Sequence, residues 1–293
     1  MNYRLLGKSE LLVSELSFGC MSLEVSTQNS ESLLRNAVEH GINYFDTADL
    51  YNHGLNEEMV GRALSPVRNQ IIVATKVGNK WKPDASGWDW YPNKKYIHKA
   101  VEESLRRLRT DYIDLYLLHG GTLDDPIDEI AEAFELLKEQ GKIRAYGLSS
   151  IRPNVIRKWA NLSNIASVMM QYSALDRRPE ENMLTYLNER KISVITRGTL
   201  AKGLLATKPP QDYLNLTAGE VRSIRHTLAG SGNPVAAALF FALRNPAVAT
   251  ACIGIRTHTQ LHELLSALSH APENSFLDEL KNSLPAHVYK NHR

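Results

Sequence analysis

Short apolar runs alternate with longer amphipathic stretches along most of the chain. The apolar runs have the length of β-strands and fall at residues 16–19, 42–46, 71–75, 113–118, 145–149, 167–171, 193–196 and 250–254. Runs of this length that alternate with helical patterns are typical of parallel βα units. We therefore predict eight parallel strands.

Helical patterns fill most of the gaps between these strands, at residues 30–40, 57–64, 93–108, 127–140, 154–160, 179–190 and 234–243. Asn154 and Pro234 are suitable helix starts, while Gly41 and Gly141 stand where helices should stop. Eight strands with helices between them favour the α/β class and a closed (β/α)8 TIM barrel.

Three segments interrupt the regular alternation. Residues 3–16 read as two short strands around a turn at Gly7, which predicts an N-terminal β-hairpin that covers the N-terminal face of the barrel. Two connections, 78–92 and 204–233, are longer than simple βα loops; the former is aromatic and the latter polar. Long loops in compact domains are usually functional or mobile, so we expect both on the C-terminal face.

Composition narrows the class of protein. A chain of 293 residues can form one barrel domain, which we expect to span residues 1–293. Its 34 basic and 32 acidic residues give no broad field for nucleic acid or an anionic membrane, and we expect a monomer. Cys20 and Cys252 form no disulfide or metal-binding pattern, and no signal peptide or membrane span is evident. We therefore expect a cytoplasmic protein without a metal site.

Four side chains suited to proton transfer follow the second, third and fourth predicted strands: Asp46, Tyr51, Lys76 and His119. TIM barrels build their active sites at the C-terminal ends of the strands. A tyrosine can donate a proton to a carbonyl oxygen, and we expect Lys76 to lower its pKa by roughly one to three units. Asp46 would hold the ammonium group, and His119 would donate to the substrate oxygen or relay a proton.

Each of these residues also has an ordinary structural explanation. Asp46 could cap a helix, Tyr51 could be an interface aromatic, and Lys76 could extend from a strand end to solvent. His119 could simply end a strand. Their joint placement after three consecutive strands favours a shared site.

Five segments together are similar to the aldo-keto reductases: LGKSELLVSELSFGCMSL, GINYFDTADLYNHGLNEEMVGRAL, IIVATKVG, DYIDLYLLH and GKIRAYGLSS. The resemblance covers nearly the whole chain. It implies a (β/α)8 barrel that binds a nicotinamide cofactor, usually NADP(H), with Asp46, Tyr51, Lys76 and His119 as the catalytic tetrad. It also implies that Tyr51 acts as the general acid while hydride passes from the nicotinamide to a carbonyl group that His119 orients.

The resemblance further implies a set of cofactor-binding residues: Gly19, Met21, Asp46, Ser149, Ser150, Gln171, Arg197, Gly198, Leu200, Lys202, Gly203, Gly254, Arg256, Thr257 and Gln260. Arg197 stands where the family has an aromatic residue that stacks on the nicotinamide. Its guanidinium could stack likewise, or bind a phosphate or an anionic substrate. Arg256 beside a helix N-terminus favours a 2′-phosphate and therefore NADP(H) over NAD(H).

Some positions depart from the family pattern. Ser150 replaces an asparagine, and Met169 replaces the glutamine that usually contacts the nicotinamide carboxamide. Gln171, two residues later, faces the same side of the strand and could take over that contact, or could instead bind a neighbouring loop. Leu264 stands where an asparagine commonly touches adenine. Lys202 is expected near the pyrophosphate or, as the alternative, on the surface.

The substrate is expected to be a small aldehyde or ketone. Trp81 and Trp88 of the aromatic connection could line its site with Tyr51 and His119, or could pack as the core of a structural loop. Two other functions stay open: a nicotinamide-binding regulatory subunit with little turnover, and a barrel enzyme that uses Lys76 as a Schiff-base nucleophile.

Overall fold

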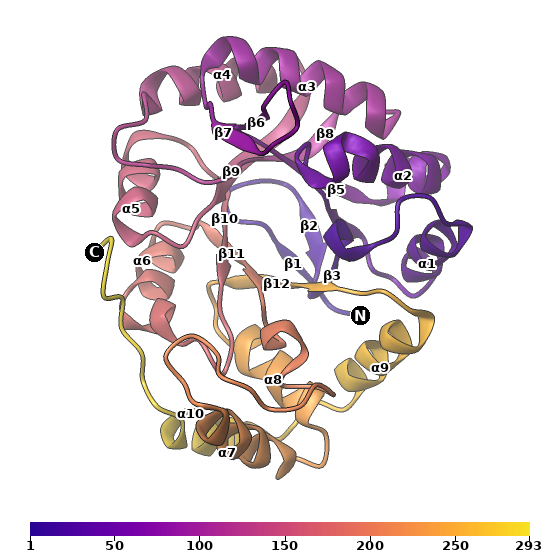
Figure 1. Ribbon diagram of the computed structural model, residues 1–293. Helices are drawn as coiled ribbons and strands as arrows, with labels where there is room; N and C mark the ends of the chain where they lie inside the picture. The colour runs from indigo at the N-terminus through magenta and orange to yellow at the C-terminus, as the bar shows by residue number, and fades with distance from the viewer.

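A computed structural model describes all 293 residues. Eight parallel strands close into a barrel in the order β10-β11-β12-β3-β4-β5-β8-β9, as Figure 1 shows looking into the barrel. They are β3 (Leu16–Gly19), β4 (Tyr44–Asp46), β5 (Ile72–Val77), β8 (Ile113–Leu118), β9 (Ile143–Ser149), β10 (Ser167–Gln171), β11 (Ser193–Arg197) and β12 (Val248–Gly254). The predicted barrel is confirmed, and the predicted strand ends differ from the observed ones by at most two residues.

Ten α-helices surround the barrel or extend the chain beyond it. They are α1 (Gln28–Glu39), α2 (Leu55–Leu64), α3 (Lys94–Leu108), α4 (Ile127–Glu139), α5 (Pro153–Leu162), α6 (Met183–Glu189), α7 (Ala218–Ala229), α8 (Pro234–Leu243), α9 (His258–Ser269) and α10 (Asn274–Ser283). The helix predicted over 179–190 is divided, because the 3-10 helix η4 (Arg178–Glu181) precedes α6. None of these helices is both long enough and apolar enough to cross a membrane.

The two long connections contain regular structure that the sequence reading missed. Residues 78–92 hold an antiparallel hairpin of β6 (Asn79–Trp81) and β7 (Trp88–Trp90). Residues 204–233 include α7, which begins with a capping box between Thr217 and Glu220. The buried side chains of this helix are Val221, Ile224 and Leu228, at helical spacing. The interpretation of 204–233 as a polar loop was therefore wrong over α7.

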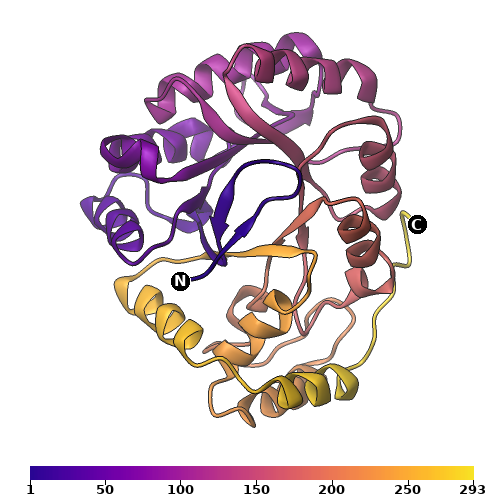
Figure 2. The same ribbon diagram turned by 180° about the vertical axis from the view of Figure 1, so that it is seen from behind.

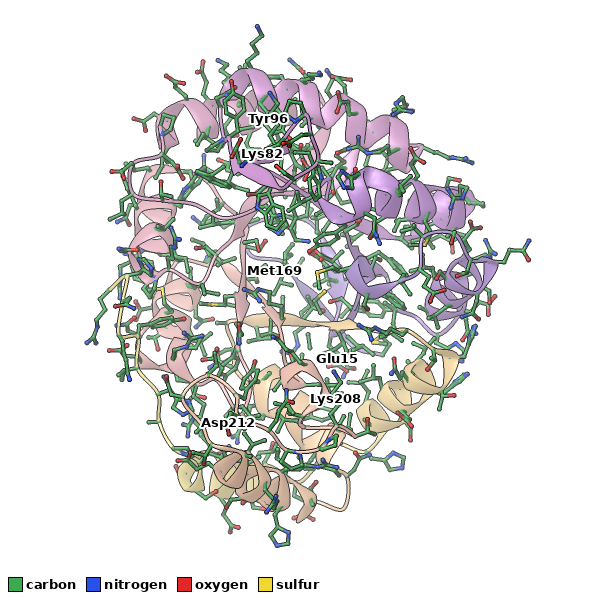
Figure 3. The ribbon with its side chains drawn as sticks, viewed as in Figure 1. Glu15, Lys82, Tyr96, Met169, Lys208 and Asp212 are labelled. Atoms are coloured by element: carbon green, nitrogen blue, oxygen red, sulfur yellow. The ribbon has the colours of Figure 1, made fainter.

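Side chains from alternate strand positions fill the barrel interior. This inner cluster includes Tyr44, Ala74, Leu117, Met169, Ile195 and Cys252, and Met169 lies near the centre in Figure 3. The N-terminal hairpin of β1 (Tyr3–Leu5) and β2 (Leu12–Ser14) crosses the barrel opening in Figure 2. Its Leu6, Leu11 and Val13 belong to the same cluster. The predicted hairpin is thus present and closes the N-terminal face, leaving the C-terminal face for the site.

Candidate active site

The strand period places three of the four predicted catalytic residues on the inner face of the barrel. Two positions before each of them lies a residue of the inner cluster, because strand side chains alternate between faces: Tyr44 before Asp46, Ala74 before Lys76 and Leu117 before His119. Asp46 ends β4, Lys76 lies near the end of β5, and His119 directly follows β8. All three therefore converge at the C-terminal mouth of the barrel.

Lys76 is the centre of the hydrogen-bond network at this mouth. Its Nζ donates to Asp46 Oδ2 at 2.7 Å, to the carbonyl oxygen of Thr47 at 2.6 Å and to Tyr51 Oη at 3.1 Å. The ammonium group has three protons, so these three acceptors satisfy it completely. Lys76 is 1% exposed and Asp46 4% exposed. A buried charge of this kind persists only because its partner and its hydrogen bonds offset the loss of water.

Tyr51 reaches Lys76 from an irregular turn between β4 and α2. It begins the 3-10 helix η2 (Tyr51–Gly54), in which Asn52 and His53 adopt left-handed backbone angles with φ of 49° and 55°. Asn56 fixes the start of this segment: it accepts a hydrogen bond from Thr47 Oγ1 at 2.7 Å and donates to the Cys20 carbonyl at 2.9 Å. Strained backbone held by such bonds is common where a side chain must be aimed.

The predicted lowering of the Tyr51 pKa was wrong in its net direction. Burial raises the pKa of Tyr51, and this effect outweighs the opposite effect of the Lys76 charge. Burial alone would lower the pKa of Lys76, but Asp46 and Tyr51 reverse this and raise it. At neutral pH Lys76 is therefore charged and the phenol keeps its proton.

His119 completes the group as a neutral imidazole. Its ring meets the Tyr51 ring edge-on, with the centroids 5.9 Å apart. Burial, together with the positive charges of Lys76 and Arg197, lowers the pKa of His119 to about 3. Nδ1 is buried without a hydrogen-bond partner. We assign the single ring proton to Nε2, which makes this nitrogen a donor at the mouth of the barrel.

Several predicted cofactor residues surround this mouth. Ser149 ends β9 and pairs in register with Met169, which fills the barrel interior. Ser150 is 7% exposed, and its hydroxyl accepts a hydrogen bond from the backbone N–H of Arg152 at 3.2 Å. Gln171 pairs in register with Arg197, whose side chain is exposed and makes no hydrogen bond or ion pair with the protein.

Gln171 was expected to contact either the nicotinamide carboxamide or a neighbouring loop, and in the structure it binds a loop. Its Nε2 donates to Tyr213 Oη at 2.8 Å, whereas its Oε1 accepts no hydrogen bond from the protein. A Cβ added to Gly198 would lie 3.5 Å from Gln171 Cγ, an ordinary van der Waals distance, so Gln171 packs beside this glycine. The amide oxygen stays free for a ligand.

Other predicted cofactor residues lie on turns at the same face. Gly198 and Gly203 have positive φ angles, and Lys202 is exposed in the 3-10 helix η5 (Ala201–Gly203), where its own φ is 58°. Leu200 is half-buried against the outer core, the larger hydrophobic cluster, which is separate from the cluster inside the barrel. Gly19 ends β3, and Met21, two residues later, is 63% exposed.

The last predicted group lies at the start of α9. Thr257 is the N-cap, and its hydroxyl accepts from the backbone N–H of Gln260 at 3.2 Å. The Gln260 side chain in turn accepts from the backbone N–H of Arg256 at 2.9 Å, so it stabilises the turn rather than standing free. Arg256 and Gly254 are exposed, and the Arg256 guanidinium has no partner in the protein. Leu264 is buried on this helix.

The aromatic residues of the β6–β7 hairpin divide into two groups. Trp81 stacks on His53 with ring centroids 3.7 Å apart and meets Trp88 edge-on at 5.7 Å, and Trp88 is 53% exposed. Trp90 instead donates from Nε1 to Asp125 at 2.7 Å and packs on the outer core. Stacking on His53 keeps Trp81 and Trp88 beside the turn that carries Tyr51.

Buried polar atoms without partners mark where a bound molecule could complete the site. They include Asp46 Oδ1, His119 Nδ1 and Trp81 Nε1. Buried polar atoms in proteins are nearly always hydrogen-bonded. A polar cofactor or substrate at the mouth of the barrel would fit these atoms.

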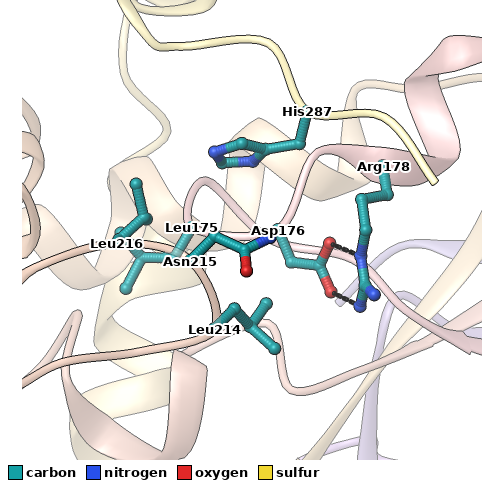
Figure 4. A pocket seen from close by; sticks show the side chains of 7 residues that line it. All are labelled: Leu175, Asp176, Arg178, Leu214, Asn215, Leu216 and His287. Carbon is teal, nitrogen blue, oxygen red and sulfur yellow. Dashed lines mark hydrogen bonds and ion pairs between the residues drawn. The ribbon is translucent and has the colours of Figure 1, made fainter. Parts of the chain in front are cut away.

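A separate small cavity of about 160 Å³ lies outside this group of residues. Figure 4 shows it between the turn after β10, a turn at 214–216 and the C-terminal segment. The Asp176 carboxylate pairs there with Arg178 through two bonds of 2.7 and 2.6 Å. None of its lining residues was predicted for the site, and its charges are already paired.

Sequence reasoning missed four contributors: Thr47, His53, Asn56 and Tyr213. Three of them lie in the segment GINYFDTADLYNHGLNEEMVGRAL, so their closeness to Tyr51 along the chain was a usable signal. Tyr213 is 42 residues from Gln171, and no local pattern connects the two.

Comparison with known proteins places the chain in a family. The model of the aldo/keto reductase family matches residues 15–283, and the chain belongs to this family. Its members are oxidoreductases that use nicotinamide cofactors, and oxidation or reduction of carbonyl compounds is the expected activity.

Individual relatives agree with this assignment. The uncharacterized oxidoreductase YqkF of Bacillus subtilis is 47% identical, with 100% of both chains covered. The holo form of the aldo-keto reductase AKR11C1 from Bacillus halodurans is 48% identical, covers 100% of this chain and 99% of its own, and has a TM-score of 0.97. The NADH-specific methylglyoxal reductase of Escherichia coli is 30% identical, with 71% of this chain and 70% of its own covered.

Proposed function

We propose that this protein reduces an aldehyde or ketone to an alcohol with NADPH as the hydride donor. The observation that carries the proposal is the Lys76 ammonium group, which joins Asp46 and Tyr51 at the mouth of the barrel with His119 edge-on to the phenol. In this proposal Trp81 and Trp88 border the substrate beside Tyr51 and His119.

The four side chains have distinct roles in the proposed reaction. His119 donates a hydrogen bond from Nε2 to the carbonyl oxygen and orients it. Tyr51 gives its proton to the same oxygen, which as an alkoxide is a stronger base than the phenolate left behind. Lys76, held by Asp46, stabilises that phenolate at 3.1 Å. A nicotinamide cofactor held at the mouth of the barrel would supply the hydride for the carbonyl carbon.

The choice of NADPH rests on the start of α9. Arg256 is exposed and unpaired beside a helix N-terminus, and this combination suits a 2′-phosphate. Ser149, Gln171 and Arg197 would hold the nicotinamide end. An NADH-specific relative exists, so the preference must be measured for this chain. The cytoplasmic location, the monomeric state and the lack of nucleic-acid and membrane partners stay predictions.

The decisive measurement follows NADPH absorbance with a panel of aldehydes for the wild type and Tyr51→Phe. We expect the variant to lose turnover by about 100-fold or more while NADPH binding changes less than about twofold, because only the proton donor is removed. Equal turnover in both proteins would contradict the role of Tyr51. NADPH binding without turnover in the wild type would instead favour the regulatory subunit.

A further inference from the structure

One side-chain hydrogen bond joins residues 204–217 to a barrel strand. It is the bond from Gln171 Nε2, at the end of β10, to Tyr213 Oη. Lys208 and Asp212 of this segment are labelled in Figure 3. The Asp212 carboxylate and the Lys208 carbonyl oxygen accept hydrogen bonds from residues of α7, not from the barrel. Tyr213 is thus the residue through which this segment forms its side-chain hydrogen bond to the strand.

A tight turn and burial hold Tyr213 in place. Tyr213 and Leu216 exchange two backbone hydrogen bonds of 2.9 and 3.0 Å across a tight turn, and both residues are buried. Leu214 within the turn has a φ of 54°, a strained angle for a leucine. The turn fixes the backbone of Tyr213, and burial of the ring in the core restricts the movement of its hydroxyl group away from Gln171.

The Tyr213 hydroxyl also lies close to the proposed nicotinamide site. A Cβ added to Gly198 would lie 4.0 Å from Tyr213 Oη and 3.5 Å from Gln171 Cγ, so these groups pack around the glycine that follows Arg197. Burial and the Asp176 charge raise the pKa of Tyr213, while the Gln171 amide and the Arg197 charge oppose this effect. The hydroxyl is therefore within electrostatic reach of both.

We propose that Tyr213 is a positioning residue for nicotinamide binding and acts through Gln171. By accepting from Nε2 it holds the amide so that the free Oε1 is presented to a ligand donor, such as the NH2 group of a carboxamide. This inference rests on the proposed function. It adds a residue from outside the barrel strands to the site and connects residues 204–217 to it.

The test compares two ligands that differ only in the nicotinamide ring. NADPH and 2′-phospho-ADP-ribose, the same molecule without nicotinamide, are titrated into the apo wild type, Tyr213→Phe, Gln171→Met and the double variant. We expect Tyr213→Phe to weaken NADPH binding about fivefold to tenfold, the effect of losing one partly buried hydrogen bond, and to leave binding of the fragment unchanged. Tyr186→Phe, which removes an exposed hydroxyl on α6, is the matched control.

The double variant separates positioning from packing. If Tyr213 acts through Gln171, Tyr213→Phe adds nothing to the loss that Gln171→Met causes alone. Additive losses would overturn the inference, as would equal weakening of NADPH and the fragment, which would show that Tyr213 only shapes the segment. Failure of the proposed function is visible separately, because the wild type itself would then show no nicotinamide binding or no carbonyl reduction.

Discussion

Burial and a single ion pair decide the protonation of the residues at the mouth of the barrel. Lys76 is held charged by Asp46, Tyr51 keeps its proton, and His119 stays neutral. A raised pKa also makes Lys76 a poor nucleophile at neutral pH, because little free amine is present. The Schiff-base alternative therefore loses its main support.

The low pKa of His119 gives a prediction about stability. The unfolded chain binds a proton at His119 near pH 6.5, whereas the folded protein binds it only near pH 3. Between these values the unfolded state holds more protons, so stability is full above pH 6.5 and falls on acidification. At pH 5 we expect the wild type to lose about 1–2 kcal/mol more than His119→Asn, relative to pH 8, in urea unfolding. The control His262→Asn changes an exposed histidine, and an equal acid response in all three proteins would contradict the buried neutral ring.

Among the secondary-structure elements, the ends of strands and helices supply the residues of the candidate active site. Asp46, Ser149, Gln171 and Arg197 are the last residues of β4, β9, β10 and β11. The start of α9 adds a different feature: the Thr257 hydroxyl accepts from the Gln260 N–H and the Gln260 side chain accepts from the Arg256 N–H, while the Arg256 guanidinium has no partner in the protein. Such a helix end can bind an anion without rearrangement.

Arg256→Ala tests whether this helix end contacts the 2′-phosphate. We expect NADPH to bind about tenfold to 100-fold more weakly, because a charge-assisted bond is lost, while NADH changes less than about twofold. Fluorescence titration of both cofactors measures the difference. Arg222→Ala removes an exposed arginine from α7 and should leave both constants unchanged. Equal losses for NADPH and NADH in Arg256→Ala would count against the phosphate contact.

Closure of the barrel is a property of the whole molecule. Each strand pairs with two neighbours, and the inner cluster joins residues from seven barrel strands and the N-terminal hairpin. Gly147 of β9 shows how closely adjacent strands approach, since an added Cβ would lie 2.4 Å from the Ser167 carbonyl oxygen of β10. The backbone must move to accept any side chain there.

Gly147→Ala is therefore expected to destabilise the whole barrel by about 3 kcal/mol, through overpacking against a neighbouring backbone. The midpoint of urea unfolding measures this loss. Gly219→Ala is the control: the glycine lies in α7 without a positive φ, and its added Cβ meets only Thr217 Oγ1, at 3.8 Å. We expect that variant to be neutral or slightly more stable. Similar midpoints for the two variants would show that β9 and β10 can separate at little cost.

Local periodicity predicted most elements because strands and amphipathic helices impose their period on the residues that they bury. It failed over α7, where polar residues and flanking glycines concealed the buried positions Val221, Ile224 and Leu228. The β6–β7 hairpin was also missed, because its short strands contain no buried residue and therefore show no alternation of buried and exposed positions.

The sequence by itself determined that eight strands alternate with helices. It also determined that the four candidate catalytic residues follow three successive strands: Asp46, Tyr51, Lys76 and His119. Both results depend on short-range patterns. Only the tertiary structure decided the direction of the Tyr51 pKa, because burial depends on everything packed around the phenol. It alone joined Gln171 to Tyr213, which lie 42 residues apart, because a contact between distant segments leaves no period in the chain.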